Sequence, residues 1–375
     1  MIMRKMLRCS LPIVVLCWSM LLFIRPAMAN CTINVPTATA PMPLQLGNIT
    51  VGADLADGTE LYKQTYNLNY ASNSIVVNCT GESQFYGYYS FSNTPLPPSS
   101  WSGGNAGKVY ETGVPGIGIY VGQGTNGSIT MPDKKPLFPL NGHTGTCTRS
   151  SCNPFEGFRR WDIHLIKTGP VSPGTIQGSQ LPCVKVNYTN DVPSDENMVQ
   201  NVCMAGSINV VASTCKTPDV TVPMGSYDVS IFSGEGSATK WVDASIKLTD
   251  CPVYHGHGGG GSWYVDGSGT NNSGKQTKNS IMVKLTPATT VINSSQGIFG
   301  FTQTANSASG AGIQLAYGTG ASPEFVDFGN TKTYEMDIGT TGISEIPLVA
   351  RYIQTDKHVT PGKADSAVTF LINYY

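Results

Sequence analysis

The last fifteen residues of the chain, 361–375, alternate between apolar and smaller side chains. Apolar residues stand at every second position, at Val368, Phe370, Ile372 and Tyr374. This period of two is typical of a β-strand with one buried face, because successive side chains leave a strand on opposite sides. A strand at the end of a chain leaves a sheet edge that another strand must pair with or cover. We therefore expect this strand to need a partner, either within the chain or outside it.

The remainder of the chain predicts an all-β protein. Charged residues make up only 13% of the 375 residues, Gly and Pro number 42 and 24, and no long stretch has helical periodicity. This composition favours short strands joined by turns. The runs that predict strands are 75–77, 85–91, 117–121, 128–131, 161–166, 208–211, 220–222, 227–232, 244–248, 280–285 and 345–353. The spacing of these runs changes after residue 212, so we expect two antiparallel β-sandwich domains, 30–212 and 213–375.

The N-terminus predicts a signal peptide over residues 1–29. Three basic residues among the first eight precede an apolar run at 11–24, and Ala27-Met28-Ala29 forms an A-x-A cleavage site. The apolar run is shorter than a membrane span requires. A lipid-modified Cys31 is the weaker alternative, because Asn30 is a poor residue before such a cysteine. The mature chain should therefore begin at Asn30 in an exported protein.

Charge and cysteine content narrow the classes of partner. Removing residues 1–29 takes away four basic residues and no acidic ones, which leaves 19 basic against 24 acidic residues. No basic cluster remains, so we expect no contact with nucleic acid. Eight cysteines remain, and an even number in an oxidising compartment predicts disulfides, although sequence alone leaves their connectivity open. The pairs that the spacing suggests are Cys31–Cys79, Cys147–Cys152, Cys183–Cys203 and Cys215–Cys251.

Three motifs imitate cofactor or metal sites. The G-x-G-x-x-G pattern at 122–127 precedes a segment that does not start a helix, so it predicts a hairpin turn instead of a dinucleotide site. The stretch 269–275 imitates a phosphate-binding loop without the final hydroxyl residue, and we interpret it as a loop. His255 and His257 precede four glycines without a third ligand nearby, which favours a mobile loop over a metal site. We expect no cofactor and no metal.

The sequence offers little for catalysis. No G-x-S-x-G motif is present, and no histidine has a local signature that links it to a nucleophile. A pair of carboxylates for glycoside hydrolysis is the enzymatic alternative, but acids scattered over loops are usually solvated. The acids considered for that pair are Glu111, Asp133, Glu156 and Asp162. We expect no catalytic site.

Aromatic and hydrogen-bonding residues are frequent in the predicted loops of the first domain. Sugar binding needs this mixture, because an aromatic face packs on C–H groups while polar groups fix the hydroxyls. The candidate receptor-binding residues are Trp101, Tyr110, Asp133, Asn141, His143 and Arg159. Trp101 is the strongest of these, since it lies between a Pro-Pro-Ser-Ser stretch and Gly103-Gly104, whereas Trp161 is expected to lie in the core.

The C-terminal pattern is more informative when residue positions are counted backward from Tyr375. Gly362 is fourteenth from the end and Tyr374 is penultimate, with alternating apolar residues between them. This arrangement resembles the C-terminal signature of chaperone–usher pilus subunits. The likeness extends to Cys215, which opens the second domain, and to the segment 244–251 that ends at Cys251.

The resemblance implies that residues 213–375 form an immunoglobulin-like sandwich that lacks its last strand. A periplasmic chaperone would fill the resulting groove first, and the N-terminal strand of an adjacent subunit would replace it. The groove-facing residues implied are Val368, Phe370, Ile372 and Tyr374. The terminal carboxylate of Tyr375 would be anchored by basic residues of the chaperone.

The start of the mature chain suggests a place in the fibre. Asn30 is followed at once by Cys31, so we expect no N-terminal extension that could be donated to a neighbour. This organisation resembles a two-domain tip adhesin, in which residues 30–212 would be a receptor-binding, usually lectin-like, domain. The resemblance implies assembly through an outer-membrane usher, a location at the fimbrium tip on the cell surface, and a glycan or protein receptor. A minor pilin that initiates or caps the fibre without binding a receptor is the structural alternative.

Overall fold

A computed structural model gives the architecture of the chain. It describes residues 31–34, 41–67, 76–79, 83–123, 129–140, 160–189, 198–258, 263–265, 270–272 and 275–375. In these segments the chain is all-β, with only short 3-10 turns besides strands. No helix within them is long and apolar enough to span a membrane. The predicted signal peptide, 1–29, lies outside the described residues.

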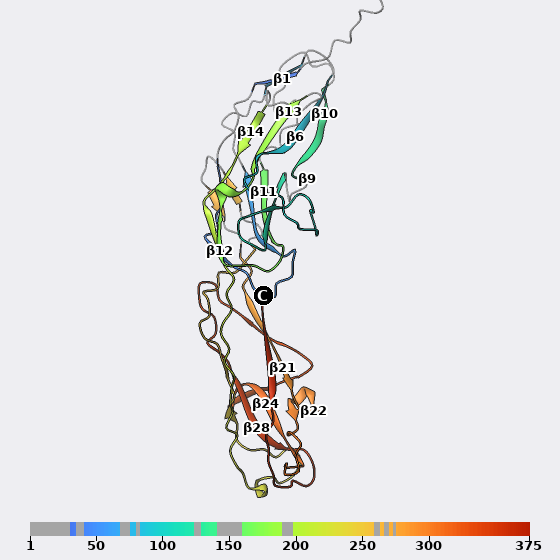
Figure 1. Cartoon of the computed structure of the whole chain (residues 1–375), viewed down its shortest axis with the longest axis vertical. Helices are drawn as coiled ribbons and strands as arrows, with labels where there is room; N and C mark the ends of the chain where they lie inside the picture. Colours follow the sequence, from blue (N-terminus) through green and yellow to red (C-terminus); the bar gives the residue numbers. More distant parts are fainter. Residues whose placement is uncertain are drawn as a thin grey trace, which may run out of the picture.

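The strands form two bodies arranged end to end, with the C-terminus between them (Figure 1). The buried apolar residues fall into two clusters, one drawn from Met42 to Val210 and the other from Cys215 to Tyr374. We call the residues up to 212 the first half and the remaining residues the second half. The chain crosses from one to the other through the short segment between β16 and Cys215.

Two sheets face each other across the core of the first half. One has the order β10 (Asp133–Leu140), β6 (Ser83–Asn93), β13 (Cys183–Thr189), β14 (Met198–Val202). The other contains β4 (Glu60–Asn67), β11 (Arg160–Lys167), β8 (Ile117–Gln123) and β7 (Tyr110–Glu111), with β9 (Ile129–Thr130) pairing with β8. Trp161, Ile163 and Leu165 alternate along β11 and are fully buried between these sheets. The prediction that Trp161 belongs to the core is confirmed.

Smaller sheets complete the first half. They are β12 (Gly174–Gln177) with β16 (Ser207–Val211) and β3 (Asn48–Thr50); β15 (Met204–Ala205) with β2 (Met42–Pro43); and β1 (Cys31–Asn34) with β5 (Val76–Cys79). The 3-10 turn η2 covers Gly178–Gln180. The antiparallel pairing of β8 with β9 confirms the hairpin predicted from the glycine motif, whose turn lies outside the described residues.

The second half consists mainly of two antiparallel sheets. One has the order β17 (Val242–Asp243), β28 (Leu348–Gln354), β24 (Ala311–Thr319), β23 (Ile298–Phe299), β22 (Val291–Asn293), with β25 (Ser322–Phe325) on β24. The other has the order β26 (Lys332–Glu335), β21 (Ser280–Pro287), β29 (Val368–Tyr374). A short antiparallel pair, β18 (Ile246–Lys247) and β27 (Glu345–Ile346), forms a separate sheet, and the 3-10 turn η5 (Ser294–Gln296) lies between β22 and β23.

A hairpin of the second half extends a sheet of the first. β19 (Trp263–Val265) pairs parallel with β4, and β20 (Thr270–Asn272) pairs with β19. The interpretation of 269–275 as a loop is therefore wrong for Thr270–Asn272. Sequence reasoning treated the glycines and asparagines as turn residues. The backbone partners of Thr270–Asn272 come from β19, which itself pairs with the edge of β4.

Two further expectations for the second half are corrected. Residues 227–232 were expected to form a strand, but Val229–Ile231 forms the 3-10 turn η4, capped by Asp228, whose carboxylate accepts a hydrogen bond from the amide of Ser230. His257, expected in a mobile loop, is buried, and its backbone exchanges hydrogen bonds with Thr277. Packing against the first half, at Leu61 and Thr50, orders this stretch.

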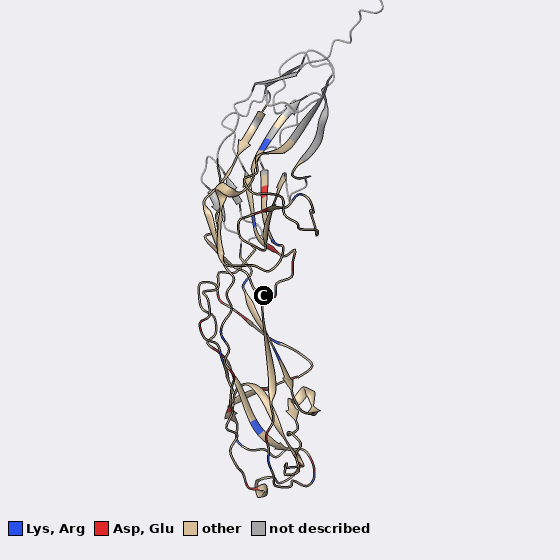
Figure 2. Cartoon of the chain, in the orientation of Figure 1, with Lys and Arg blue, Asp and Glu red and all other residues tan. Residues whose placement is uncertain are grey.

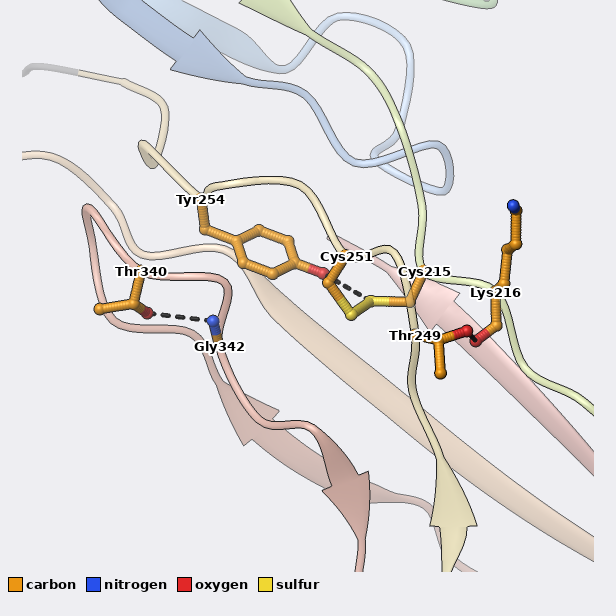
Figure 3. Close-up of a disulfide and its surroundings, with 7 residues drawn as sticks. All are labelled: Cys215, Lys216, Thr249, Cys251, Tyr254, Thr340 and Gly342. Carbon is orange, nitrogen blue, oxygen red and sulfur yellow. Dashed lines mark hydrogen bonds between the residues drawn. A yellow bond between two sulfur atoms is a disulfide. The ribbon is translucent and has the colours of Figure 1, made fainter.

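The structure contains two of the disulfides suggested by the cysteine spacing, Cys183–Cys203 and Cys215–Cys251. Beside the second one, the backbones of Lys216 and Thr249 exchange hydrogen bonds, and the Tyr254 hydroxyl lies 3.4 Å from Cys215 Sγ (Figure 3). Cys31 and Cys79 lie opposite each other in the register of β1 and β5. Cys147 and Cys152 lie outside the described residues.

Candidate functional site

An apolar groove of about 650 Å³ runs along the second half between β29 and the segment 220–226. Its floor belongs to both sheets of this half. The apolar residues on the floor are Ala244, Ile246, Leu285, Phe299, Ile313, Leu315, Leu348 and Ala350. The groove thus opens into the second core, and its residues belong to the same cluster that stabilises this half.

Both sides of the groove are strand-like segments with an unpaired edge. β29 pairs along one edge with β21, in a register that runs from Pro287–Val368 to Ile281–Tyr374. Among the described strands no other pairs with β29, and the segment 220–226 belongs to no ladder at all. The expected strand 220–222 is therefore extended chain without a sheet partner. Two unpaired edges that face one groove are suited to receive one additional strand.

The alternating residues of β29 lie on its core side. Val368 and Phe370 line the groove, while Ile372 and Tyr374 pack in the second core. Leu371, on the opposite face, is 58% exposed. The inward face predicted from the period of two is thus present, and its first two residues are the ones that border the groove.

Gly362 lies outside the groove. A Cβ atom at this position would lie 2.7 Å from the carbonyl oxygen of Asn306 and would overlap the backbone of residues 307 and 308. The next residue, Lys363, donates its amide to Asn306 and accepts from the amide of Ala308. Gly362 therefore permits a close approach of two backbone segments in the stretch that precedes β29.

The C-terminal end of β29 lies at the junction between the halves. The Tyr375 amide donates to the Ser280 carbonyl, and the Asn279 side chain donates to Tyr375 O at 3.2 Å. Asn279 is buried and also donates to Thr50 O of the first half at 3.0 Å. The chain terminus, expected to bind a chaperone through its carboxylate, therefore lies beside residues of the first half.

The structure describes three of the six candidate receptor residues. Trp101 is half-buried, and its indole Nε1 donates to Gly104 O of its own loop at 2.8 Å. Tyr110, on β7, packs edge-to-face on Phe91 with a centroid distance of 5.0 Å. Asp133 begins β10. Asn141, His143 and Arg159 lie outside the described residues.

Two groups of residues were missed by the sequence reasoning. One is the junction set of Thr50, Asp54 and Asn279, which carries no sequence motif. The other contains Asp162 and His164 on β11, where Asp162 was considered only as a catalytic acid. Their alternation with buried Trp161 and Ile163 was the signal that placed them on the opposite face of the sheet. In the described part of the chain, no group of three potential metal ligands comes together.

Comparisons with known proteins fit the two halves separately. Residues 203–375 match the model of the family described as Fimbrial protein, which covers the groove, β29 and the second core. Residues 42–178 match the MrkD-like receptor binding domain. The chain thus joins a segment similar to a receptor binding domain to a segment similar to a fimbrial protein, the organisation of a two-domain fimbrial adhesin.

Solved structures with similar chains are adhesins and pilins. The receptor binding domain of the adhesin MrkD1P of Klebsiella pneumoniae is 16% identical and covers 50% of this chain and 99% of its own, with a TM-score of 0.34. The CupB6 tip adhesin of Pseudomonas aeruginosa is 16% identical and covers 92% of this chain and 95% of its own, with a TM-score of 0.33. The P pilus rod subunit PapA, at 16% identity, covers 44% of this chain and 100% of its own, with a TM-score of 0.30. No curated protein matches the chain.

Proposed function

We propose that this fimbrial adhesin sits at the tip of its fibre and binds a receptor through its first domain, 30–212, while its second domain, 213–375, joins it to the fibre. The observation that carries the proposal is the groove between β29 and the segment 220–226. It exposes part of an apolar core and has an unpaired edge on either side. The match of this region to the fimbrial family supports the assignment.

Donor-strand complementation is the mechanism that this geometry supports. A strand inserted into the groove would hydrogen-bond to β29 and to residues 220–226, and its alternate side chains would enter the groove. Val368 and Phe370 would contact those side chains, since both line the groove. A periplasmic chaperone would provide this strand first, and an adjacent fimbrial subunit would provide it after passage through the outer-membrane usher.

The first domain would recognise a glycan or protein on a host or other surface. Its match to the MrkD-like receptor binding domain supports this role. Export to the periplasm, directed by the signal peptide 1–29, and display at the fibre tip follow from the same proposal.

Co-expression with the chaperone of the same fimbrial system tests the mechanism. We expect the full chain to co-purify with the chaperone and a chain that lacks residues 368–375 to be lost from the complex. Normal co-purification of the shortened chain would contradict strand complementation. The complex of the full chain, applied to glycan and matrix-protein arrays, tests receptor binding. Failure to bind on either array would favour a minor pilin that only initiates or caps the fibre.

A further inference from the structure

The strand β11 carries polar residues on the face turned away from the first core. Trp161, Ile163 and Leu165 alternate into the core, so Asp162 and His164 lie on the opposite face of the sheet. Across the ladders, Asp162 pairs with Thr65 of β4, and His164 pairs with Lys63 of β4 and Tyr120 of β8. Residues opposite each other in a ladder share a face, so these side chains form one polar patch.

Hydrogen bonds and ring contacts hold this patch together. The Thr65 hydroxyl donates to Asp162 Oδ1 at 2.6 Å. His164 Nδ1 lies 2.7 Å from Glu60 Oε2. The Tyr120 ring stacks on the His164 ring, with centroids 4.4 Å apart and planes at 8°. Burial, together with the nearby carboxylates of Glu60 and Asp162, raises the pKa of Tyr120 to about 12.

Among the residues that the structure describes, two polar atoms of this patch have no hydrogen-bond partner. They are Asp162 Oδ2 and His164 Nε2, on side chains of residues that are 0% and 4% exposed. Buried polar atoms in folded proteins nearly always have a partner, so these two require an explanation. Neither Asp162 nor His164 is needed for the core, because both point away from it.

We propose that this patch, formed by Asp162, His164, Glu60, Thr65 and Tyr120, binds a hydroxyl-rich ligand, a sugar unit of a glycan. This inference rests on the proposed receptor-binding function of the first domain and locates its site. Sugar hydroxyls would donate to Asp162 Oδ2 and bond to His164 Nε2, the two atoms that the chain leaves unpaired. Glu60 and Tyr120 form the partly exposed rim that such a ligand meets first.

The chemistry of the two atoms favours hydroxyl donors. The carboxylate oxygen Asp162 Oδ2 is an acceptor, and an imidazole Nε2 can accept or donate, so sugar hydroxyls, which do both, suit the two atoms. The two residues are two positions apart on one strand, which separates them by roughly 7 Å, a span that one sugar ring can bridge. The Tyr120 ring stacks on His164 and is partly exposed, so it can contact the C–H groups of a sugar.

Lys63 lies directly opposite His164 in the β4–β11 ladder and places a positive charge beside the carboxylates of Glu60 and Asp162. The patch therefore carries charges of both signs, which suits a neutral ligand with several hydroxyl groups. The partly exposed side chains of Glu60 and Tyr120 form the rim past which the ligand reaches Asp162 and His164.

Binding of the full chain, purified with its chaperone, to a glycan array and to a matrix-protein array tests the inference. The variant Asp162→Asn keeps the size of the side chain and removes its charge. We expect it to bind the recognised glycan about 10- to 100-fold more weakly, because one charged hydrogen bond is lost. The control Glu345→Gln makes the same chemical change on the surface of the second half, where Glu345 pairs with Lys247, and should leave binding unchanged.

Tyr120→Leu gives a second variant for the case in which Asp162→Asn does not fold. We expect it to weaken glycan binding because it removes the aromatic face. Glycan binding that both folded variants retain, or binding by the wild type to a matrix protein alone, would overturn this inference and leave the receptor-binding function standing. Absence of binding to either array would instead overturn that function and, with it, the inference.

Discussion

Asp54 holds the backbone of Tyr374 by two hydrogen bonds. The Asp54 amide donates to the Tyr374 carbonyl at 2.9 Å, and the Tyr374 amide donates to Asp54 Oδ2 at 2.7 Å. Asp54 belongs to the first half, whereas Tyr374 ends the strand that lines the groove of the second. The strand that we propose as the acceptor of a donated strand is therefore also a structural tie between the two halves.

Figure 2 marks the charged residues along the chain. Besides the Asp54 carboxylate, backbone and side-chain amide groups make the contacts described at the junction. The Thr50 amide donates to Gly256 O at 2.9 Å, and the Gly258 amide donates to Leu61 O at 2.7 Å. Asn279 accepts from the Gly256 amide and donates to Thr50 O and Tyr375 O. With the pairing of β19 and β4, these contacts join the halves independently of the connecting segment.

The first prediction concerns Asn279. Replacing it with Ala leaves buried backbone groups of both halves without a partner, which should lower the free energy of unfolding by about 1–3 kcal/mol. We expect calorimetry to show a lower Tm and limited proteolysis to cleave the chain between the halves more rapidly. Asn93→Ala, at an exposed position of β6, is the matched control. Equal proteolysis of the two variants would show that Asn279 does not stabilise the junction.

The second prediction compares the two faces of β29. Phe370→Asp places a carboxylate in the groove, where burial of an unpaired charge is strongly unfavourable. Leu371→Asp makes the same change one residue later, on the exposed face. We expect the first variant to lose its chaperone and the second to retain it, measured by co-purification. If both variants retain the chaperone, the groove is not the chaperone site.

The third prediction concerns Gly362. The added Cβ of Gly362→Ala would overlap the backbone of residues 306–308, so the two segments must separate. We expect a loss of about 1–3 kcal/mol in stability, as for other overpacked sites, seen as a lower denaturation midpoint in urea. In Gly47→Ala the new methyl group meets no atom within 4 Å, so this variant serves as the control. An unchanged midpoint for Gly362→Ala would show that the backbone contact relaxes freely.

The fourth prediction concerns pH. Burial lowers the pKa of His257 below its ordinary value of 6.5. Between the lowered pKa and pH 6.5, His257 carries a proton in the unfolded chain but not in the folded chain. The free energy of unfolding is therefore undiminished above pH 6.5 and decreases as the pH falls below it. His257→Gln should therefore reduce the acid sensitivity of unfolding between about pH 7 and pH 5. An acid sensitivity that His257→Gln leaves unchanged would contradict this prediction.

Local periodicity was sufficient to predict many of the strands. β8, β11, β21 and β28 coincide closely with alternating runs, because each has one face in a core. The same reasoning was wrong for 227–232, where apolar residues form a 3-10 turn, and for Thr270–Asn272, where polar residues form a strand. In these two stretches the neighbouring elements outweigh the preference of the residues themselves.

The candidate receptor-binding residues depend on tertiary structure as well. Trp101, Tyr110 and Asp133 were selected by residue type alone, and their role in receptor binding stays a prediction. Asp162 and His164 become conspicuous only when the alternation of β11 is combined with the register of β4 and β8. Which polar atoms remain unpaired then depends on neighbours that are far away in the sequence.

By itself, the sequence determined the all-β class and the inward face of the C-terminal strand, since both depend on periodicity and composition along the chain. Cysteine spacing suggested the pairing of Cys215 with Cys251, and the structure established it. Only the tertiary structure decided that β29 borders an unfilled groove and ends against Asp54, and that a hairpin of the second half joins a sheet of the first. The physical reason is that these features rest on backbone hydrogen bonds between distant segments. Every residue carries the same backbone groups, so such contacts leave no signature in the residue types.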